Sequence, residues 1–134
     1  MGKDRVMRFV VADRQPSTRS ALKLLVEQYP DMECDGAAGD AEGLRKLVEL
    51  AQPDLVLVEW EVLGIGPKGT LSAIKTASSA TVVVLSCCLD RAIPLEAGAD
   101  YYISKVDKPE HLIRVIQDIR CRFVAGSAKN TPTG

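Results

Sequence analysis

The chain has 134 residues, of which 46% are hydrophobic and 26% are charged, and its formal net charge is −1. That length accommodates one globular domain, and the hydrophobic content excludes a disordered chain. A balanced charge gives no electrostatic attraction to nucleic acid or to an anionic membrane, so we expect this domain to bind neither directly.

The sequence carries no sign of a membrane span or an export signal. No apolar run approaches the ~20 residues that a membrane-spanning helix needs, and residues 1–5 do not lead into the long apolar stretch of a secretion signal. We therefore expect a cytoplasmic protein. The cysteines lack the spacing of a zinc site, which favours reduced and mostly buried thiols at Cys34, Cys87, Cys88 and Cys121.

Short β-rich runs alternate with longer amphipathic segments. In chain order, the predicted elements are a strand over residues 6–12, a helix over 16–29, a weak strand over 33–38, a helix over 41–51, a strand over 55–58, a glycine-rich loop over 60–68, a helix over 69–78, a strand over 81–85, a short helix over 89–97, a strand over 101–103 and a last helix from 109. Asp40 is the predicted N-cap of the second helix. Pro94 weakens the fourth helix, and Gly98 ends it.

Five strands alternating with five helices predict an α/β domain with a parallel sheet and helices on both faces. We place this domain at residues 5–124 and a disordered tail or linker at residues 125–134. In open sheets of this kind the site lies at the carboxyl ends of the central strands. The residues at those ends are Asp13 and Arg14 after the first strand, Glu59 after the third, Ser86 after the fourth and Lys105 beyond the fifth.

These residues lie in runs that resemble the response-regulator receiver domain, namely PDLVLVE at 53–59, LS at 85–86 and AGADYYISK at 97–105. The family has an acidic pair after the first strand, a phosphoaccepting aspartate after the third, a hydroxyl after the fourth and a lysine after the fifth. The resemblance spans roughly residues 5–122. It implies a flavodoxin-like, doubly wound sheet of order 2-1-3-4-5, a switch position at Tyr102 and a metal-binding carbonyl near Glu61.

The chain departs from this family at two positions of the pocket. Glu59 replaces the aspartate and moves the carboxylate by ~1.5 Å, where a misplacement of ~1 Å can slow a positioned reaction about a hundredfold. Arg14 replaces one acid of the pair, and its cation would repel a metal ion. We expect Arg14 or Lys105 to pair with Glu59 or Asp13, and we expect the Mg²⁺ site to be lost, with no other cofactor.

A further departure is a segment between Ser86 and Lys105 that is shorter than in the family, so we expect the helix containing Pro94 to be short, bent or partly unwound. In the family, that helix with the last strand and helix forms the signalling face. A possible homodimer would use the part of this face built from Ile103 and the last helix.

The resemblance implies a module of two-component, phosphorelay-type signalling that acts by protein contact, without enzymatic activity and without phosphorylation. The implied protein partners are a histidine kinase or an output domain, and a DNA-binding output domain for transcription regulation is the expected continuation of a longer protein. Glu59 either imitates the phosphorylated form in part and holds the domain in one state, or belongs to a relic pocket.

Two alternatives remain open from the sequence. One is an ordinary receiver that accepts phosphate on Glu59. The other is a flavodoxin-like domain that binds a small ligand or nucleotide, for which residues 64–69 match G-x-G-x-x-G. In a dinucleotide site the first glycine follows the strand directly, but here residues 59–63 intervene, so a flexible loop is the favoured interpretation.

Overall fold

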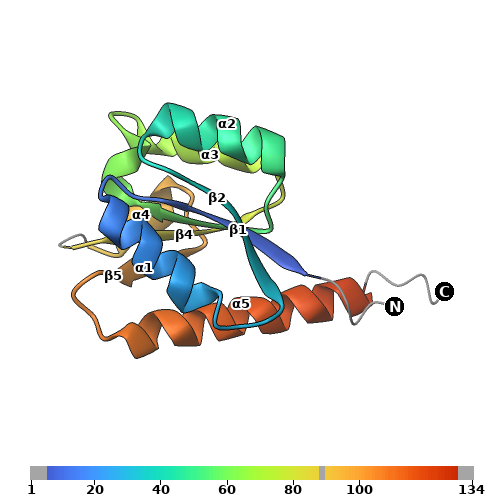
Figure 1. Ribbon diagram of the computed structural model, residues 1–134. Helices are drawn as coiled ribbons and strands as arrows, with labels where there is room; N and C mark the ends of the chain where they lie inside the picture. Colours follow the sequence, from blue (N-terminus) through green and yellow to red (C-terminus); the bar gives the residue numbers. More distant parts are fainter. Residues whose placement is uncertain (1–5, 88–89, 130–134) are drawn as a thin grey trace.

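The computed structural model describes residues 6–87 and 90–129, and it contains a five-stranded parallel sheet of order β2-β1-β3-β4-β5 with helices on both faces (Figure 1). The flavodoxin-like, doubly wound order expected from the sequence is confirmed. The strands are β1 (Met7–Ala12), β2 (Met32–Ala38), β3 (Leu55–Glu59), β4 (Thr81–Ser86) and β5 (Tyr101–Ser104). The helices are α1 (Pro16–Val26), α2 (Ala41–Ala51), α3 (Pro67–Ala77), α4 (Ala92–Ala97) and α5 (Pro109–Lys129).

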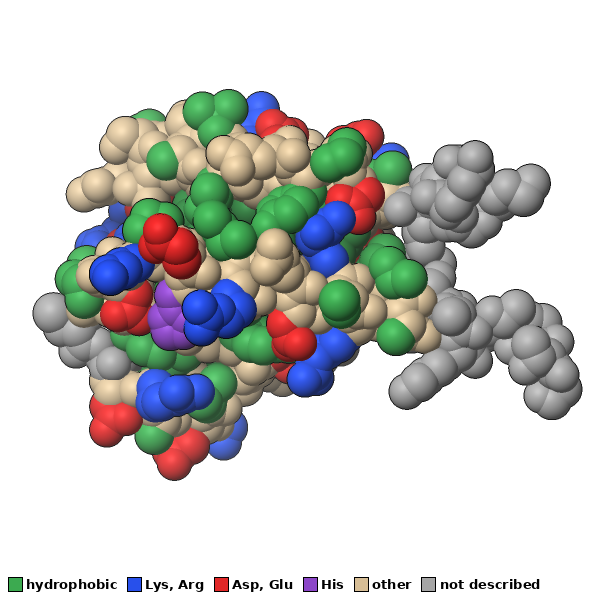
Figure 2. Space-filling model, turned by 90° about the horizontal axis from the view of Figure 1, so that it is seen from below, with side chains coloured by type: hydrophobic (Ala, Val, Ile, Leu, Met, Phe, Trp, Pro, Cys, Tyr) green, Lys and Arg blue, Asp and Glu red, His purple; other side chains and the backbone are tan. Residues whose placement is uncertain are grey.

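Two apolar layers hold the helices to the sheet, because successive strand residues point to opposite faces. Val10 of β1 packs with Leu44 of α2 and Ile74 of α3 on one face. Phe9, the neighbour of Val10, packs with Val26 of α1 and Ile116 of α5 on the other. The α1 and α5 face carries apolar side chains between charged ones (Figure 2). It includes a groove of about 310 Å³ between α1 and the start of α5.

Helix α2 forms over the predicted residues and is closed at both ends by side chains. The Asp40 carboxylate accepts a hydrogen bond from the Gly43 N–H at 2.7 Å, as predicted for its N-cap. Gln52 follows the helix in a left-handed conformation with a φ of 50°, and its side-chain amide donates to the carbonyl of Ala77 at the end of α3 at 2.8 Å. This hydrogen bond joins the ends of α2 and α3.

Several predicted boundaries were wrong. Helix α1 ends at Val26 and not at residue 29, because the chain turns there and the Tyr29 N–H bonds to the Val26 carbonyl. The predicted loop at 60–68 is a 3₁₀ helix (Trp60–Leu63) followed by α3, which begins at Pro67 because the fixed φ of proline suits the first helical turn. Helix α4 is short, as expected, and begins only at Ala92.

The C-terminal helix extends past the predicted end of the domain. Helix α5 continues to Lys129, beyond the boundary placed after residue 124, because the chain has no proline before residue 132 to stop it. The domain boundary itself stays a prediction, and the rest of the predicted tail, residues 130–134, lies outside the described residues. In the described part of the chain, no helix is long and apolar enough to cross a membrane.

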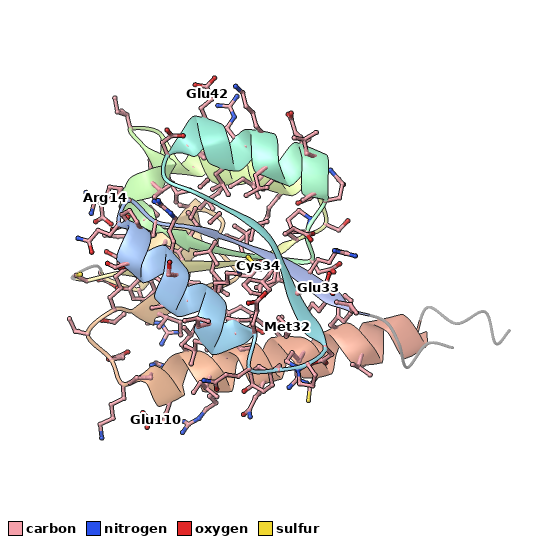
Figure 3. All side chains as sticks on the ribbon, in the orientation of Figure 1. Arg14, Met32, Glu33, Cys34, Glu42 and Glu110 are labelled. Carbon is pink, nitrogen blue, oxygen red and sulfur yellow. The ribbon has the colours of Figure 1, made fainter. Side chains whose placement is uncertain are left out.

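The prediction that the cysteines are mostly buried was wrong. Cys87 and Cys121 are exposed, and Cys34 of β2 is partly buried (Figure 3). Cys88 lies outside the described residues. Cys87 follows the last residue of β4, beyond the buried part of the strand. Cys121 lies on the side of α5 that faces away from the sheet and is therefore exposed to solvent.

Sheet register determines where the candidate site lies. Ala12 of β1 pairs with Val58 of β3, and Ser86 of β4 pairs with Ser104 of β5. The residues that follow these positions therefore meet at one edge of the sheet. That edge carries Asp13, Glu59 and Lys105.

Candidate functional site

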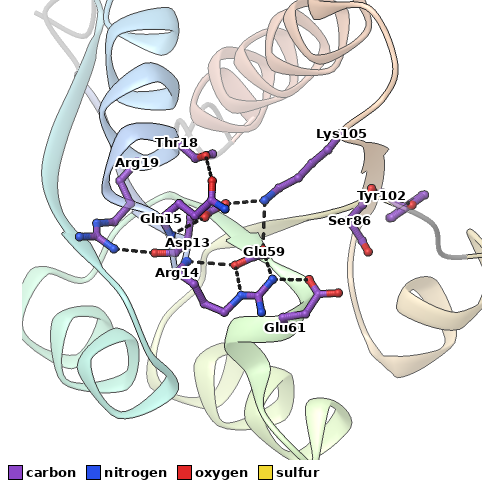
Figure 4. Close-up of polar contacts among 10 residues, drawn as sticks. All are labelled: Asp13, Arg14, Gln15, Thr18, Arg19, Glu59, Glu61, Ser86, Tyr102 and Lys105. Atoms are coloured by element: carbon purple, nitrogen blue, oxygen red, sulfur yellow. Dashed lines mark hydrogen bonds and ion pairs between the residues drawn. The ribbon is translucent and has the colours of Figure 1, made fainter.

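Side chains from three strand ends converge at the carboxyl edge of the sheet (Figure 4). Asp13 follows β1, Glu59 ends β3, and Lys105 follows β5. Asp13 is 1% exposed and Glu59 is 5% exposed. Two buried carboxylates at neighbouring strand ends require compensation by cations or hydrogen bonds, because burying an unpaired charge is strongly unfavourable.

Arg14 supplies one of the two compensating cations. Its Nε donates to Glu59 Oε1 at 3.0 Å, and its Nη2 donates to Oε2 at 2.8 Å. This is the two-pronged geometry that fits a guanidinium to a carboxylate. The backbone N–H of Arg14 also donates to Glu59 Oε1 at 3.0 Å. The extra methylene of glutamate brings its carboxylate within reach of both groups, so the two departures from the family pattern bond to each other.

Lys105 supplies the second cation and bridges both acids. Its Nζ donates to Asp13 Oδ2 at 2.6 Å and to Glu59 Oε2 at 3.2 Å. The lysine side chain is 20% exposed, so its ammonium is partly withdrawn from water. The pairing expected from the sequence is therefore present in three contacts, one from Arg14 to Glu59 and one from Lys105 to each of the two acids.

The proton affinities follow from this arrangement. Burial alone would raise the pKa of Glu59, but hydrogen bonds from Arg14 and Lys105 outweigh burial and lower it to about 2. Burial alone would lower the pKa of Lys105, whereas its bonds to Asp13 and Glu59 raise it. Each group is held in its charged form across the neutral pH range.

Comparison with known proteins relates the chain to response regulators. No protein-family model matches the chain. The chain is 29% identical over 127 residues to the nitrate/nitrite response regulator protein NarL of Escherichia coli K12, a match that covers 92% of this chain and 59% of NarL. It is 31% identical over 117 residues to the transcriptional regulatory protein LiaR of Bacillus subtilis 168, covering 84% of this chain and 55% of LiaR. The chain spans just over half the length of these relatives.

A solved structure extends this likeness to the fold over most of the chain. A two-component response regulator of the LuxR family from Aurantimonas sp. SI85-9A1 matches with a TM-score of 0.77 and 25% identity, over 90% of this chain and 86% of that one. The chain contains a response-regulator receiver domain. In this receiver, the acid and cation cluster lies at the sheet edge where the family resemblance placed the pocket.

The remaining predicted residues lie at the edge of the receiver pocket, and only Glu61 among them touches the ion-pair cluster with its side chain. Arg14 Nη2 is 4.0 Å from Glu61 Oε1, a long ion pair. Ser86 is buried, and its carbonyl accepts hydrogen bonds from the Lys105 N–H at 2.8 Å and from the Tyr102 hydroxyl at 3.3 Å. The Ser86 hydroxyl donates no hydrogen bond to Asp13 or Glu59.

Sequence reasoning missed two residues that hold Asp13 in place. Arg19 Nη1 donates to the Asp13 carbonyl at 2.7 Å, and the Gln15 N–H donates to Asp13 Oδ1 at 2.9 Å. A Cβ at Gly39 would lie 3.0 Å from Arg19 Nη1, so the small residue there leaves room for the arginine. One signal was available, because a cation near the start of α1 is unfavourable with the helix dipole and so suggests another partner.

The donors of this receiver pocket do not fit Mg²⁺. That ion binds through hard oxygen ligands in an octahedron. Here both buried carboxylates already bind Lys105 or Arg14, and a divalent cation beside them would be repelled by the ammonium and the guanidinium. Across residues 6–87 and 90–129, no group of three Asp, Glu, His or Cys side chains is placed to hold a metal ion.

Proposed function

We propose that this receiver takes part in two-component, phosphorelay-type signal transduction by protein contact alone, without accepting a phosphoryl group. One observation carries the proposal. The oxygens of Glu59 accept four hydrogen bonds, two from the Arg14 guanidinium, one from the Arg14 backbone and one from Lys105. The group that would have to attack phosphorus is fully engaged in bonds within the chain.

The chemistry of phosphoryl transfer supports this proposal. Transfer depends on positioning and on neutralising charge around the phosphoryl group. The pKa of Glu59, lowered to about 2, makes its carboxylate a poor nucleophile, and attack would also require breaking the pair with Arg14. Arg14 and Lys105 neutralise Asp13 and Glu59, so little charge remains to bind a divalent metal. The proposed receiver therefore uses no Mg²⁺ and has no enzymatic turnover.

The same contacts favour one constant state over a phosphorylation switch. Two cations balance the two buried acids, so Glu59 does not present the excess negative charge that a phosphorylated aspartate would. In this proposal the cluster is a fixed structural element that holds three strand ends together. A signal would then arise from binding a protein partner, such as a histidine kinase or an output domain. The apolar groove beside Lys105, lined by Leu22 and Leu112, is compatible with such a contact.

Fluorescence of Trp60 tests the proposal directly. Trp60 is the single tryptophan of the chain, it follows Glu59, and it is partly buried against the core. We expect no change on adding Mg²⁺ and then beryllofluoride, and no phosphorylated species by intact mass after incubation with acetyl phosphate. A Mg²⁺-dependent beryllofluoride response would identify an ordinary phosphoaccepting receiver. A response to nucleotides alone would identify a small-ligand domain. The variant Arg14→Asp/Glu59→Asp is the comparison protein, and we expect it to respond in both readouts.

A further inference from the structure

A second cavity lies at the opposite edge of the sheet from the acid and cation cluster. This cleft has a volume of about 570 Å³, within the range of small-molecule sites. It is bounded by the first residues of β1, β4 and β5, by the turn before β3 and by the second half of α5. We call it the amino-edge cleft, and the residues that carry the argument are Met7, Asp54, Asp100, Ile119, Arg122 and Phe123.

One wall of the amino-edge cleft is apolar. Met7 of β1 is 2% exposed and Ile119 of α5 is 3% exposed, so both lie behind the wall and close it from the core side. Phe123 of α5 is only partly buried against the same core layer and supplies accessible apolar surface. Tyr101 adds the edge of an aromatic ring at the start of β5. A ligand with an apolar body would bury surface against this wall and gain roughly 25 cal/mol per Å² of apolar area removed from water.

The polar side of the cleft has an excess of negative charge. Asp54 and Asp100 line it, and among the residues that the structure describes Arg122 is the one cation in its lining. Arg122 Nε lies 3.1 Å from Asp118 Oδ2, so its charge is balanced by an acid outside the lining. The charge of Asp100 is likewise balanced, by Lys75, a cation outside the lining. Within the described part of the chain, Asp54 forms no ion pair, and its Oδ2 accepts only the Arg8 N–H at 2.9 Å.

We propose that the amino-edge cleft binds a small amphipathic monocation, an amine or guanidine carried on an aromatic or branched aliphatic body. The ammonium or guanidinium would pair with the carboxylate of Asp54, and the apolar body would lie against Tyr101 and Phe123. This site is independent of the phosphoacceptor edge, because its lining shares no residue with the cluster of Asp13, Glu59 and Lys105. Bound ligand would also join the second half of α5 to the strands.

Nuclear magnetic resonance titration of the full chain with 2-phenylethylamine tests the proposal. Two probes of similar size, neutral 2-phenylethanol and anionic phenylacetate, separate the charge requirement from the apolar one. We expect amide shifts centred on Tyr101, Ile119 and Phe123 with the amine, weaker shifts with the alcohol and none with the acid. Hydrogen exchange of the amides at residues 119–125 should slow when the amine is bound.

Two variants and a control identify the residues responsible. Asp54→Asn keeps an oxygen for the Arg8 N–H but removes the charge, and should weaken amine binding about threefold or more while leaving the alcohol unchanged. Phe123→Ala should weaken both. Glu42→Gln removes one exposed carboxylate on the outer side of α2, remote from the cleft, and should change neither (Figure 3). Equal responses to all three probes, shifts centred elsewhere or no shift at millimolar amine would overturn the proposal, as would an unchanged affinity in Asp54→Asn.

Discussion

The Arg14 guanidinium meets the Glu59 carboxylate edge to edge, with Nε 3.0 Å from Oε1 and Nη2 2.8 Å from Oε2. The two side chains differ sharply in exposure, because 59% of the arginine faces solvent and only 5% of the glutamate does. The acid is thus part of the interior and the cation closes over it from outside. Replacing Arg14 should therefore alter the electrostatics of the pocket without opening the core.

The first prediction concerns the proton affinity of Glu59. In Arg14→Ala, the pKa of Glu59 should rise from about 2, because burial then opposes ionisation with only Lys105 and the residue 14 N–H left to offset it. Carbon-detected NMR titration of the Glu59 carboxyl measures this change. Arg45→Ala is the matched control, because Arg45 is exposed on α2. An unchanged Glu59 titration in Arg14→Ala would mean that the pair contributes nothing in solution.

The second prediction concerns metal binding. Arg14→Asp together with Glu59→Asp should produce a Mg²⁺-dependent change in Trp60 fluorescence. Removing a cation that lies about 4 Å from the position of a divalent ion is expected to raise the affinity of the pocket for Mg²⁺ on the order of a hundredfold or more. Glu59→Asp alone should respond little, because Arg14 still occupies the pocket. If the double variant folds but ignores Mg²⁺, the strand ends themselves have diverged from a metal-binding arrangement.

The fold was predictable because its signals are local and repeated. The runs at β3 and β4 are wholly apolar, and Asp40 marks the start of α2 where its side chain caps the helix. Boundaries failed where a single turn decides them. The Tyr29 N–H closes a turn onto Val26, and Pro67 starts α3 two residues before the predicted glycine. Such choices depend on tertiary packing and not on periodicity.

The candidate site was predictable as a set of positions but not as a set of bonds. Strand register places Asp13, Glu59 and Lys105 together in any sheet of this order, so their proximity follows from topology. Which cation binds which acid depends on side-chain reach. The sequence left four pairings open, and three of them occur. The contact of Arg19 with the Asp13 carbonyl depends on how α1 leaves the sheet. A cation near the start of a helix signals that it needs a partner, but the sequence does not say which one.

The third prediction concerns the bridge between the two acids. Lys105→Met should lower the free energy of unfolding by about 3 kcal/mol, near the lower end of the range for breaking a buried ion pair, because Asp13 then loses its cation. Chemical denaturation at neutral pH measures this loss. Lys46→Met makes the same substitution at an exposed lysine that lies 3.6 Å from Glu42, and should cost less than about 0.5 kcal/mol. Equal effects of the two substitutions would show that Lys105 is held no more strongly than a surface charge.

The fourth prediction concerns acid stability. A carboxylate whose pKa falls from 4.5 in the unfolded chain to about 2 in the folded one adds stability above pH 4.5, and that stability is lost as the pH drops from about 4.5 to about 2. The size of this contribution is on the order of 3 kcal/mol, since one pKa unit is worth about 1.4 kcal/mol. In Glu59→Gln this pH-dependent contribution is absent. Denaturation curves of the two proteins should therefore differ most at neutral pH and converge towards pH 2. Glu42→Gln, at an exposed position, should stay within about 0.5 kcal/mol of the parent chain at every pH. A constant gap between Glu59→Gln and the parent chain from pH 7 to pH 2 would contradict the assignment, because it would mean that Glu59 takes up its proton equally readily in the folded and unfolded chains.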